Sequence, residues 1–159
     1  MSSGNNVFFW KPPCVFSQWT SSRFVIDNVE YCCAEQYMMS RKAKVFEDVV
    51  ILKQIMATSD PRKHRELGRK ISNYNDKIWN SVSLDIVIEG NKHKFYQNPD
   101  MLKKLLKTKG KTLVEASPFD KIWGIGMAYT HKNILDETKW GQNKLGIALM
   151  RVRELLADA

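Results

Sequence analysis

The feature that most constrains the fold of this chain is a series of short segments whose apolar residues recur at the spacing of a helix. Residues that favour the start or the end of a helix bound these segments. Asp60-Pro61 and Asn98-Pro99 each place an N-cap residue before a proline, which favours the first position of a helix. Gly68 is a stop signal for the helix that begins at Pro61. The spacing predicts helices over 34–55 (one helix or two), 61–68, 73–88, 99 to an end near 107–110, and 145–156.

A smaller set of β-prone segments accompanies these helices. Residues 23–26 and 29–31 flank Asp27-Asn28, a pattern typical of a hairpin with a two-residue turn. Residues 112–116 favour a buried strand. The predicted fold class is therefore α+β, mainly helical, with a few short strands. Since no repeat, low-complexity tract or Gly/Ser linker interrupts the 159 residues, we expect a single domain over 1–159.

Composition and the longest apolar runs exclude several classes of protein. A chain with 43% hydrophobic and 26% charged residues is neither disordered nor fibrous. Its apolar runs fall far short of the roughly 20 residues of a membrane-spanning helix. Residues 1–6 are small and polar, unlike a secretory signal. We therefore expect a soluble protein without a membrane partner, located in the cytoplasm, or in the nucleus of a eukaryotic cell.

The placement of cysteine and histidine argues against a disulfide framework and against a metal site. The cysteines, Cys14, Cys32 and Cys33, are odd in number, and a bridge within the adjacent pair would be strained. Zinc motifs pair their ligands at spacings of about two to five residues. The three histidines are scattered singly. We expect buried or incidental thiols, no metal and no cofactor.

The positive charge is concentrated in one segment. The formal net charge is +8, and residues 92–111 contain seven lysines and one acidic residue, Asp100. One interpretation is a solvated helix face and loop. The other is an electropositive rim that attracts a phosphorylated ligand or a nucleic acid backbone. Composition alone does not choose between them.

Charged residues inside apolar surroundings are the candidates for chemistry. Glu35 lies at the start of a predicted helix, and Lys42 follows two turns later on the same face, so the two side chains could line one cavity. Asp120 lies among aromatic residues ahead of Gly124, which permits close approach of a ligand. Each has an ordinary alternative: a carboxylate favoured by the helix dipole, a surface lysine, and a turn-capping aspartate.

Two segments are candidates for binding phosphate. Residues 140–146 open the last predicted helix, where backbone N–H groups favour an anion. Arg69 follows the stop signal of an earlier helix and could supply a guanidinium fork. A plain N-cap explains Asn143 equally well, and a surface arginine explains Arg69.

A set of short segments follows in a fixed order along nearly the whole chain. They are Ser17-Gln18-Trp19, Ala34-Glu35-Gln36-Tyr37-Met38-Met39, Lys42-Ala43, Phe46, Leu67-Gly68-Arg69, Trp79, Lys94-Phe95, Gln97-Asn98, Leu113-Val114-Glu115-Ala116-Ser117-Pro118, Asp120, Trp123-Gly124-Ile125-Gly126, Gly141, Asn143, Leu145-Gly146, Leu149-Met150 and Val152-Arg153. From about residue 8 to residue 156, their order and spacing resemble the NADAR, or YbiA-like, family. The family commonly has Ser-Asn-Phe or a close relative in place of Ser17-Gln18-Trp19.

The resemblance implies an N-glycosidase that cleaves the bond between ribose C1 and a base or amine nitrogen. Two substrate classes follow from it: ADP-ribose on guanine in DNA or RNA, and the phosphorylated ribosylamino-pyrimidine intermediates of riboflavin synthesis. The alternatives are a catalytically inactive module that binds ADP-ribose or a nucleotide, and a nucleic-acid-binding protein that uses residues 92–111.

The chemistry of this bond assigns roles to the candidate residues. The Lys42 amine could displace the base as a Schiff base while Glu35 and Asp120 move protons, or water could attack directly with the two carboxylates as base and acid. The remaining residues would bind substrate: Trp79 and Trp123 by stacking, Arg69, Asn143 and the Gly141 backbone at the phosphate, and Ser17, Gln18, Trp19 and Gly124 in the pocket wall.

Overall fold

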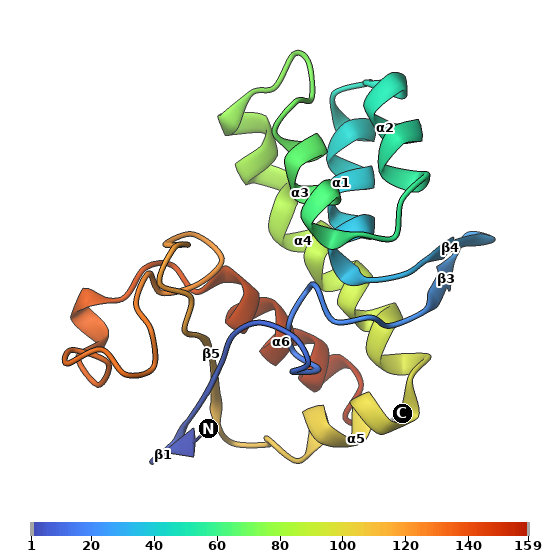
Figure 1. The fold of residues 1–159 in the computed structure, drawn as a ribbon. Coiled ribbons are helices and arrows are strands. Elements are labelled where there is room, and N and C mark those ends of the chain that lie inside the picture. Colours follow the sequence, from blue (N-terminus) through green and yellow to red (C-terminus); the bar gives the residue numbers. More distant parts are fainter. Residues whose placement is uncertain (1, 159) are drawn as a thin grey trace. The chain divides into compact units, whose positions relative to one another are not determined.

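The computed structural model describes residues 2–158, which form two compact units (Figure 1). Unit 1 comprises residues 2–20 and 99–158, and unit 2 comprises residues 21–98. Of the described residues, about half lie in six α-helices and a few in short strands, which confirms the predicted mainly helical α+β class. Within the described range, no helix combines the length and apolar character needed to cross a membrane.

Unit 2 is a hairpin followed by four helices. The hairpin strands β3 (Phe24–Ile26) and β4 (Val29–Tyr31) are antiparallel, and both turn residues have positive φ, 51° at Asp27 and 67° at Asn28. This is the predicted two-residue turn. The helices are α1 (Ala34–Val45), α2 (Val49–Met56), α3 (Pro61–Gly68) and α4 (Asp76–Tyr96). Helix α1 packs against the other three (Figure 1).

Local signals explain where these helices begin and end. Glu47, with φ 57°, breaks the 34–55 segment into α1 and α2, and the Asp48 carboxylate accepts the Ile51 N–H at the start of α2. Helix α3 begins as predicted, because Asp60 accepts the Arg62 N–H and Pro61 occupies the first turn.

The predicted boundaries of the fourth helix are wrong. It begins at Asp76, behind its N-cap Asn75, and continues through Tyr96 instead of ending at residue 88. The apolar pattern stops near residue 88 because the next buried positions include polar residues, Asn91 and Lys94. Gly90 is not a break: a Cβ there would lie 2.6 Å from Tyr37 Cδ2, so glycine permits α4 to pack closely on α1.

Unit 1 is built from both ends of the chain. Strand β1 (Ser2–Ser3) pairs antiparallel with β2 (Asn6–Phe9), which pairs parallel with β5 (Thr112–Glu115). The helices are α5 (Pro99–Leu106), a short 3-10 helix (Glu137–Lys139) and α6 (Lys144–Leu155), which packs on β5. Its core contains Phe8, Val114, Ala116, Ile125 and Met127.

This topology explains why the sequence carries no linker signal. Each end of unit 1 folds against the other, so the chain passes between the units twice, in an irregular segment at 20–21 and at 98–99, where α5 begins. That the two units act as one domain over 1–159 stays a prediction.

Candidate functional site

Lys42 lies in a cage of aromatic rings within unit 2. Its Nζ is 4.6 Å from the centroid of the Tyr74 ring and 5.8 Å from that of Trp79. The same ammonium group donates a hydrogen bond to the Gly68 carbonyl oxygen at 3.0 Å. Trp79 is buried, and Phe46 packs edge-on against Tyr74 with ring centroids 5.3 Å apart. The amine of this half-buried lysine thus lies beside two aromatic rings and one carbonyl acceptor, and Tyr74 itself is 42% exposed.

Burial lowers the pKa of Lys42 below its ordinary value of 10.5. The nearby Glu35 carboxylate opposes this shift of the lysine pKa, and the positive charge of Arg69 adds to it. Since burial is the largest of these causes, a larger fraction of the amine is neutral near pH 7 than for a lysine in water. A neutral amine is the nucleophilic form.

Helix α1 places Glu35 and Lys42 on one face, as the sequence predicts. Glu35 lies in the first turn of α1 and its side chain is buried, with 8% exposed. Arg69 follows the end of α3 and is exposed. A Cβ at Gly68 would overlap the Met39 sulfur, so glycine lets the end of α3 approach α1 closely. Unit 2 thus brings together Glu35 and Lys42 from α1, Arg69 from the residue after α3, and Trp79 from α4.

Tyr74 is a member of this group that the sequence did not indicate. Its hydroxyl donates to the Asp76 carboxylate at 2.6 Å, and burial with this hydrogen bond raises the pKa of Tyr74 to about 12. The residue lies in a polar loop between α3 and α4, where no periodic pattern marks it.

In unit 1, Asp120 shapes the loop that carries Trp123. One carboxylate oxygen, Oδ1, accepts the N–H groups of Ile122 and Trp123, each at 2.9 Å. This is the turn-capping alternative to a catalytic role. The Lys144 ammonium lies 4.6 Å from the centroid of the Trp123 ring, and burial lowers the pKa of Lys144. The sequence pointed to Trp123 but not to this cation.

The backbone amides predicted to hold phosphate already donate to carbonyl groups. The Gly141 N–H donates to Ile125 O at 2.9 Å, and the Asn143 N–H donates to Gly124 O at 3.1 Å. The next two amides at the start of α6, those of residues 144 and 145, donate to the carbonyls of residues 122 and 123. This arrangement closes the start of α6 with protein atoms.

Asn143 and two of the motif glycines hold this junction together. The Asn143 side chain donates to Leu113 O at 2.9 Å and accepts the Glu115 N–H at 3.0 Å, which ties the start of α6 to β5. A Cβ at Gly124 would lie 2.8 Å from Glu115 O, and one at Gly141 would overlap Lys121 O. The close approach that these glycines permit is between two protein segments.

The remaining predicted residues of the pocket wall lie in unit 1, between β2 and the hairpin in sequence. Ser17 is buried, and its hydroxyl accepts the Trp19 N–H at 3.2 Å. Gln18 and Trp19 are half-buried. The assignment of all these residues to substrate binding or catalysis stays a prediction.

One group of described side chains has the donor atoms for a metal ion, and the sequence did not indicate it. Cys32, Cys33 and His64, all in unit 2, each place one ligand atom within 4.8 Å of the others. The hydrogen bond between the two sulfurs lowers the pKa of Cys32 to about 7, and with burial it raises that of Cys33. His64 is 31 residues from Cys33, which is why ligand spacing along the chain gave no signal.

The chain is similar to a protein family and to several named proteins over most of its length. A family model described as NADAR domain matches residues 8–157. N-glycosidase R617 of Acanthamoeba polyphaga mimivirus is 48% identical over 146 residues, covering 88% of this chain and 86% of the relative. Protein irg-1 of Caenorhabditis elegans is 39% identical over 167 residues, covering 94% of this chain and 79% of the relative.

A bacterial relative supplies a structural comparison. N-glycosidase YbiA of Escherichia coli is 30% identical over 142 residues, covering 89% of this chain and 81% of the relative. The NMR structure of the E. coli protein YbiA superimposes with a TM-score of 0.78 at 26% identity, covering 99% of this chain and 88% of that chain. The fold described above is therefore the fold of that structure.

Proposed function

Because this chain belongs to the NADAR family, we propose that it is an N-glycosidase acting on the bond between C1 of a phosphorylated ribose and a base or amine nitrogen. Family membership and the relatives named N-glycosidase support the general part, a hydrolase of N-glycosyl bonds. Two substrates fit this chemistry: ADP-ribose on guanine in nucleic acid, and the phosphorylated ribosylamino-pyrimidine intermediates of riboflavin synthesis. Both present a phosphorylated ribose on an exocyclic nitrogen.

The observation that carries the proposal is the desolvated Lys42 amine beside Glu35. An N-ribosylamine opens to an imine at C1, and the neutral Lys42 nitrogen adds to this carbon. The base amine then leaves with a proton, and the sugar remains on Lys42 as a Schiff base. Water adds to C1, releases the ribose and returns the amine. Glu35 is the group on α1 that moves protons in these steps.

The lowered pKa of Lys42 favours this covalent route over direct attack by water. In direct displacement, two carboxylates act as base and acid, and a neutral amine has no task. In the covalent route the lysine must lose its proton before it attacks, and a pKa below the ordinary value makes this loss easier. The second proposed carboxylate, Asp120, retains a proton-transfer role only through an atom other than the Oδ1 that caps its turn.

Binding of the substrate is assigned to side chains more than to backbone amides. Trp79 and Trp123 supply faces on which a base can stack. Arg69 is an exposed guanidinium that can hold a phosphate, and Lys144 adds a cation at Trp123. The backbone amides of Gly141 and Asn143 donate to carbonyl groups of the protein. We therefore propose that these amides stabilise the conformation of the loop and do not contact the phosphate.

The test compares cleavage and covalent trapping in the same set of proteins. The substrates are a short DNA strand with ADP-ribosylated guanine and, separately, the riboflavin intermediates, each incubated with and without borohydride. The variants are Lys42→Arg, Glu35→Gln and Asp120→Asn, with Lys44→Arg as the matched control, an exposed lysine on the same helix. The substrate that is cleaved identifies the physiological class.

The expected result is cleavage of one substrate by the wild type and by Lys44→Arg, with borohydride trapping the sugar on both proteins. Lys42→Arg should retain the charge but give neither cleavage nor a trapped adduct. Loss of a positioned acid or base in Glu35→Gln should slow cleavage by about 10²- to 10⁴-fold. If neither substrate is cleaved while ADP-ribose still binds, the chain is the inactive binding module. If Lys42→Arg cleaves at the wild-type rate, the covalent route is wrong.

A further inference from the structure

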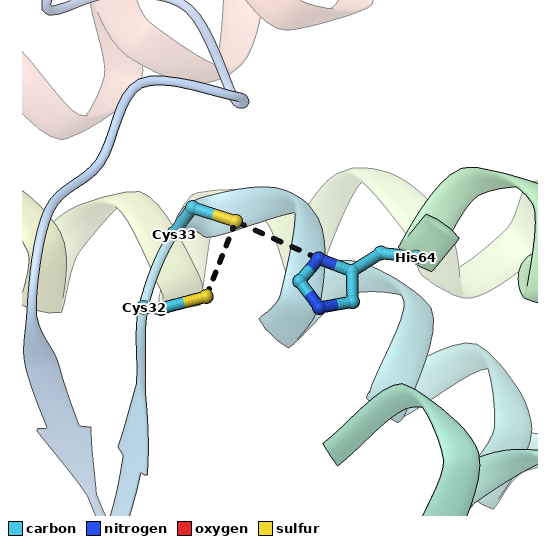
Figure 2. A group of neighbouring side chains, drawn as sticks. All are labelled: Cys32, Cys33 and His64. Atoms are coloured by element: carbon cyan, nitrogen blue, oxygen red, sulfur yellow. Dashed lines mark hydrogen bonds between the residues drawn. The ribbon is translucent and has the colours of Figure 1, made fainter. Parts of the chain in front are cut away.

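We propose that Cys32, Cys33 and His64 form a binding site for a single thiophilic d¹⁰ metal ion, Zn²⁺ or Cu⁺. Figure 2 shows the three side chains converging, the cysteines from the chain that enters α1 and the histidine from α3. Cys33 Sγ lies 3.8 Å from Cys32 Sγ and 3.7 Å from His64 Nδ1. Thiolate sulfur and imidazole nitrogen are the donors that such ions prefer.

These distances are the ones that ligands of one ion must keep from each other. With Zn–S near 2.3 Å and Zn–N near 2.0–2.1 Å, tetrahedral angles put two sulfurs about 3.8 Å apart and a sulfur and a nitrogen about 3.6 Å apart. The separations at Cys33 agree with both values to within about 0.1–0.2 Å. The third separation, between the ligand atoms of Cys32 and His64, is at most 4.8 Å, so these two side chains would approach each other by up to about 1.2 Å to bind one ion.

The second nitrogen of His64 is held in the way that metal-binding imidazoles require. Nε2 lies 2.6 Å from the Thr58 carbonyl oxygen, which can only accept, so Nε2 carries the proton. This fixes the tautomer in which Nδ1 has a free lone pair, and Nδ1 is the atom that faces Cys33. His64 is completely buried, so the ring cannot turn away into solvent.

A hydrogen-bonded frame holds the other ligands. The Cys32 N–H donates to the Gln36 side-chain oxygen at 2.8 Å. The Gln36 amide nitrogen donates in turn to Ile55 O and Thr58 O, each at 3.2 Å. Thr58 O thus accepts from both Gln36 and His64 and links the cysteine pair to the histidine. All of these hydrogen bonds are made between protein groups, so the frame holds Cys32 and His64 near each other and lowers the cost of assembling the site.

A metal ion can reach the site from the side of Cys32, and a fourth ligand is available there. This residue is half-buried, unlike Cys33 and His64, so an ion can reach the cluster from its side. Cys32 Sγ also lies 3.8 Å from Ser59 O, so this carbonyl or a water molecule can occupy the fourth position. The two sulfurs are much farther apart than the roughly 2.05 Å of a disulfide bond.

The ion would join the beginning of α1 to α3 inside unit 2. Cys33 is the N-cap residue of α1, two residues before Glu35, and His64 lies in the middle of α3. Its role is structural, and it is independent of the N-glycosidase proposal, because the binding test does not use a substrate.

The test is titration of the reduced, full-length protein under anaerobic conditions. Co²⁺ serves as the spectroscopic probe, because cobalt–thiolate bonds give a charge-transfer absorption band. Zn²⁺ is then added to displace Co²⁺, and Cu⁺ is titrated separately against a chromogenic chelator. The variants are Cys32→Ser, which changes a half-buried side chain, and Cys33→Ser, with Cys14→Ser in unit 1 as the matched control. Circular dichroism of the metal-free proteins verifies that each variant is folded.

We expect one ion per chain in the wild type and in Cys14→Ser, with displacement of Co²⁺ by Zn²⁺ or binding of Cu⁺. Loss of an outer-shell partner alone typically weakens metal binding by about 10- to 100-fold, so loss of a ligand in folded Cys32→Ser should cost more than about 100-fold. Two results would overturn the proposal: no thiolate band and no Cu⁺ binding in the wild type, or unchanged affinity in Cys32→Ser. In either case the cluster is only a set of hydrogen-bonded side chains.

Discussion

Replacement of Asn143 by alanine separates the structural role seen at this residue from the phosphate-binding role that the sequence predicts. Its side chain bridges β5, since Nδ2 donates to Leu113 O at 2.9 Å and Oδ1 accepts the Glu115 N–H at 3.0 Å. The residue is also buried and has φ 53°, in the left-handed region. Alanine removes both hydrogen bonds and adopts this conformation less readily than asparagine.

The expected loss of stability is large compared with the total. A buried backbone group that loses its partner costs about 1–3 kcal/mol, and there are two such groups. The left-handed conformation adds about 1 kcal/mol for a residue with an ordinary side chain. The sum, about 3–7 kcal/mol, is a major part of the roughly 5–15 kcal/mol that stabilises a typical domain. Asn143→Ala should therefore be strongly destabilised or fail to fold.

Urea denaturation followed by circular dichroism measures this loss, and Asn143→Gly is the matched control. Glycine also removes both hydrogen bonds but adopts positive φ without strain, so it should be about 1 kcal/mol more stable than Asn143→Ala. The reasoning is refuted if Asn143→Ala unfolds at the wild-type urea concentration. If that variant is stable and yet loses affinity for ADP-ribose, Asn143 contacts the ligand as the sequence predicted.

Four further predictions concern Lys42, Arg153 and Gly68. Since burial lowers the pKa of Lys42, kcat/KM should rise with pH and level off at an apparent pKa below 10.5. Between that pKa and 10.5 the unfolded state binds more protons, so the free energy of unfolding rises with pH, and Lys42→Met should remove this slope in urea titrations. Arg153→Met should lower stability by at least about 1.5 kcal/mol, because Nη1 donates to Thr108 O and Lys111 O, each at 2.8 Å. Gly68→Ala should cost about 1–3 kcal/mol through overlap with the side chain of residue 39, measured as a shift in Tm.

Local sequence signals predicted much of the fold because their physical causes lie within a few residues. Asp60 accepts the N–H two residues later, and Asp27-Asn28 both adopt positive φ, so each signal acts where it stands in the sequence. The end of α4 was missed because its cause is distant. Glycine at position 90 makes room for the ring of Tyr37, which lies more than fifty residues earlier in the sequence. Lys94 is a polar residue at a buried position, so it interrupts the helical pattern of apolar residues.

The candidate site divides in the same way. The placement of Glu35 and Lys42 on one face of α1 follows from helical periodicity alone. The cage around Lys42 does not, because Tyr74 lies in an irregular loop and reaches the amine only through the packing of α3 and α4 on α1. The grouping of Cys33 with His64 is likewise a product of tertiary structure.

The structure also shows how much of the positive charge of segment 92–111 lies at the surface. Lys94 is completely buried, and its ammonium lies 5.0 Å from the centroid of the Phe95 ring, so it adds no charge to the surface. Lys92 pairs with Glu89 at 3.1 Å on α4. The segment crosses from unit 2 to unit 1 at residues 98–99, and its remaining lysines lie on α5 and the turn after it. Sequence clustering of lysines therefore overstates the charge that one surface presents.

The motif residues of the family have either a structural or a chemical role, and the stability of their variants distinguishes the two roles. In unit 1, Asn143, Gly124 and Gly141 fix the junction of β5, the loop and α6, so loss of activity in their variants is also expected from loss of structure. Lys42 differs from these residues, because burial disfavours the charged form of its side chain although the ammonium donates to Gly68 O and lies beside two aromatic rings. A buried group whose pKa is shifted by its surroundings is a candidate for a chemical role. Loss of activity in a stable Lys42 variant is therefore the stronger argument for a catalytic residue than the same loss anywhere in the unit 1 junction.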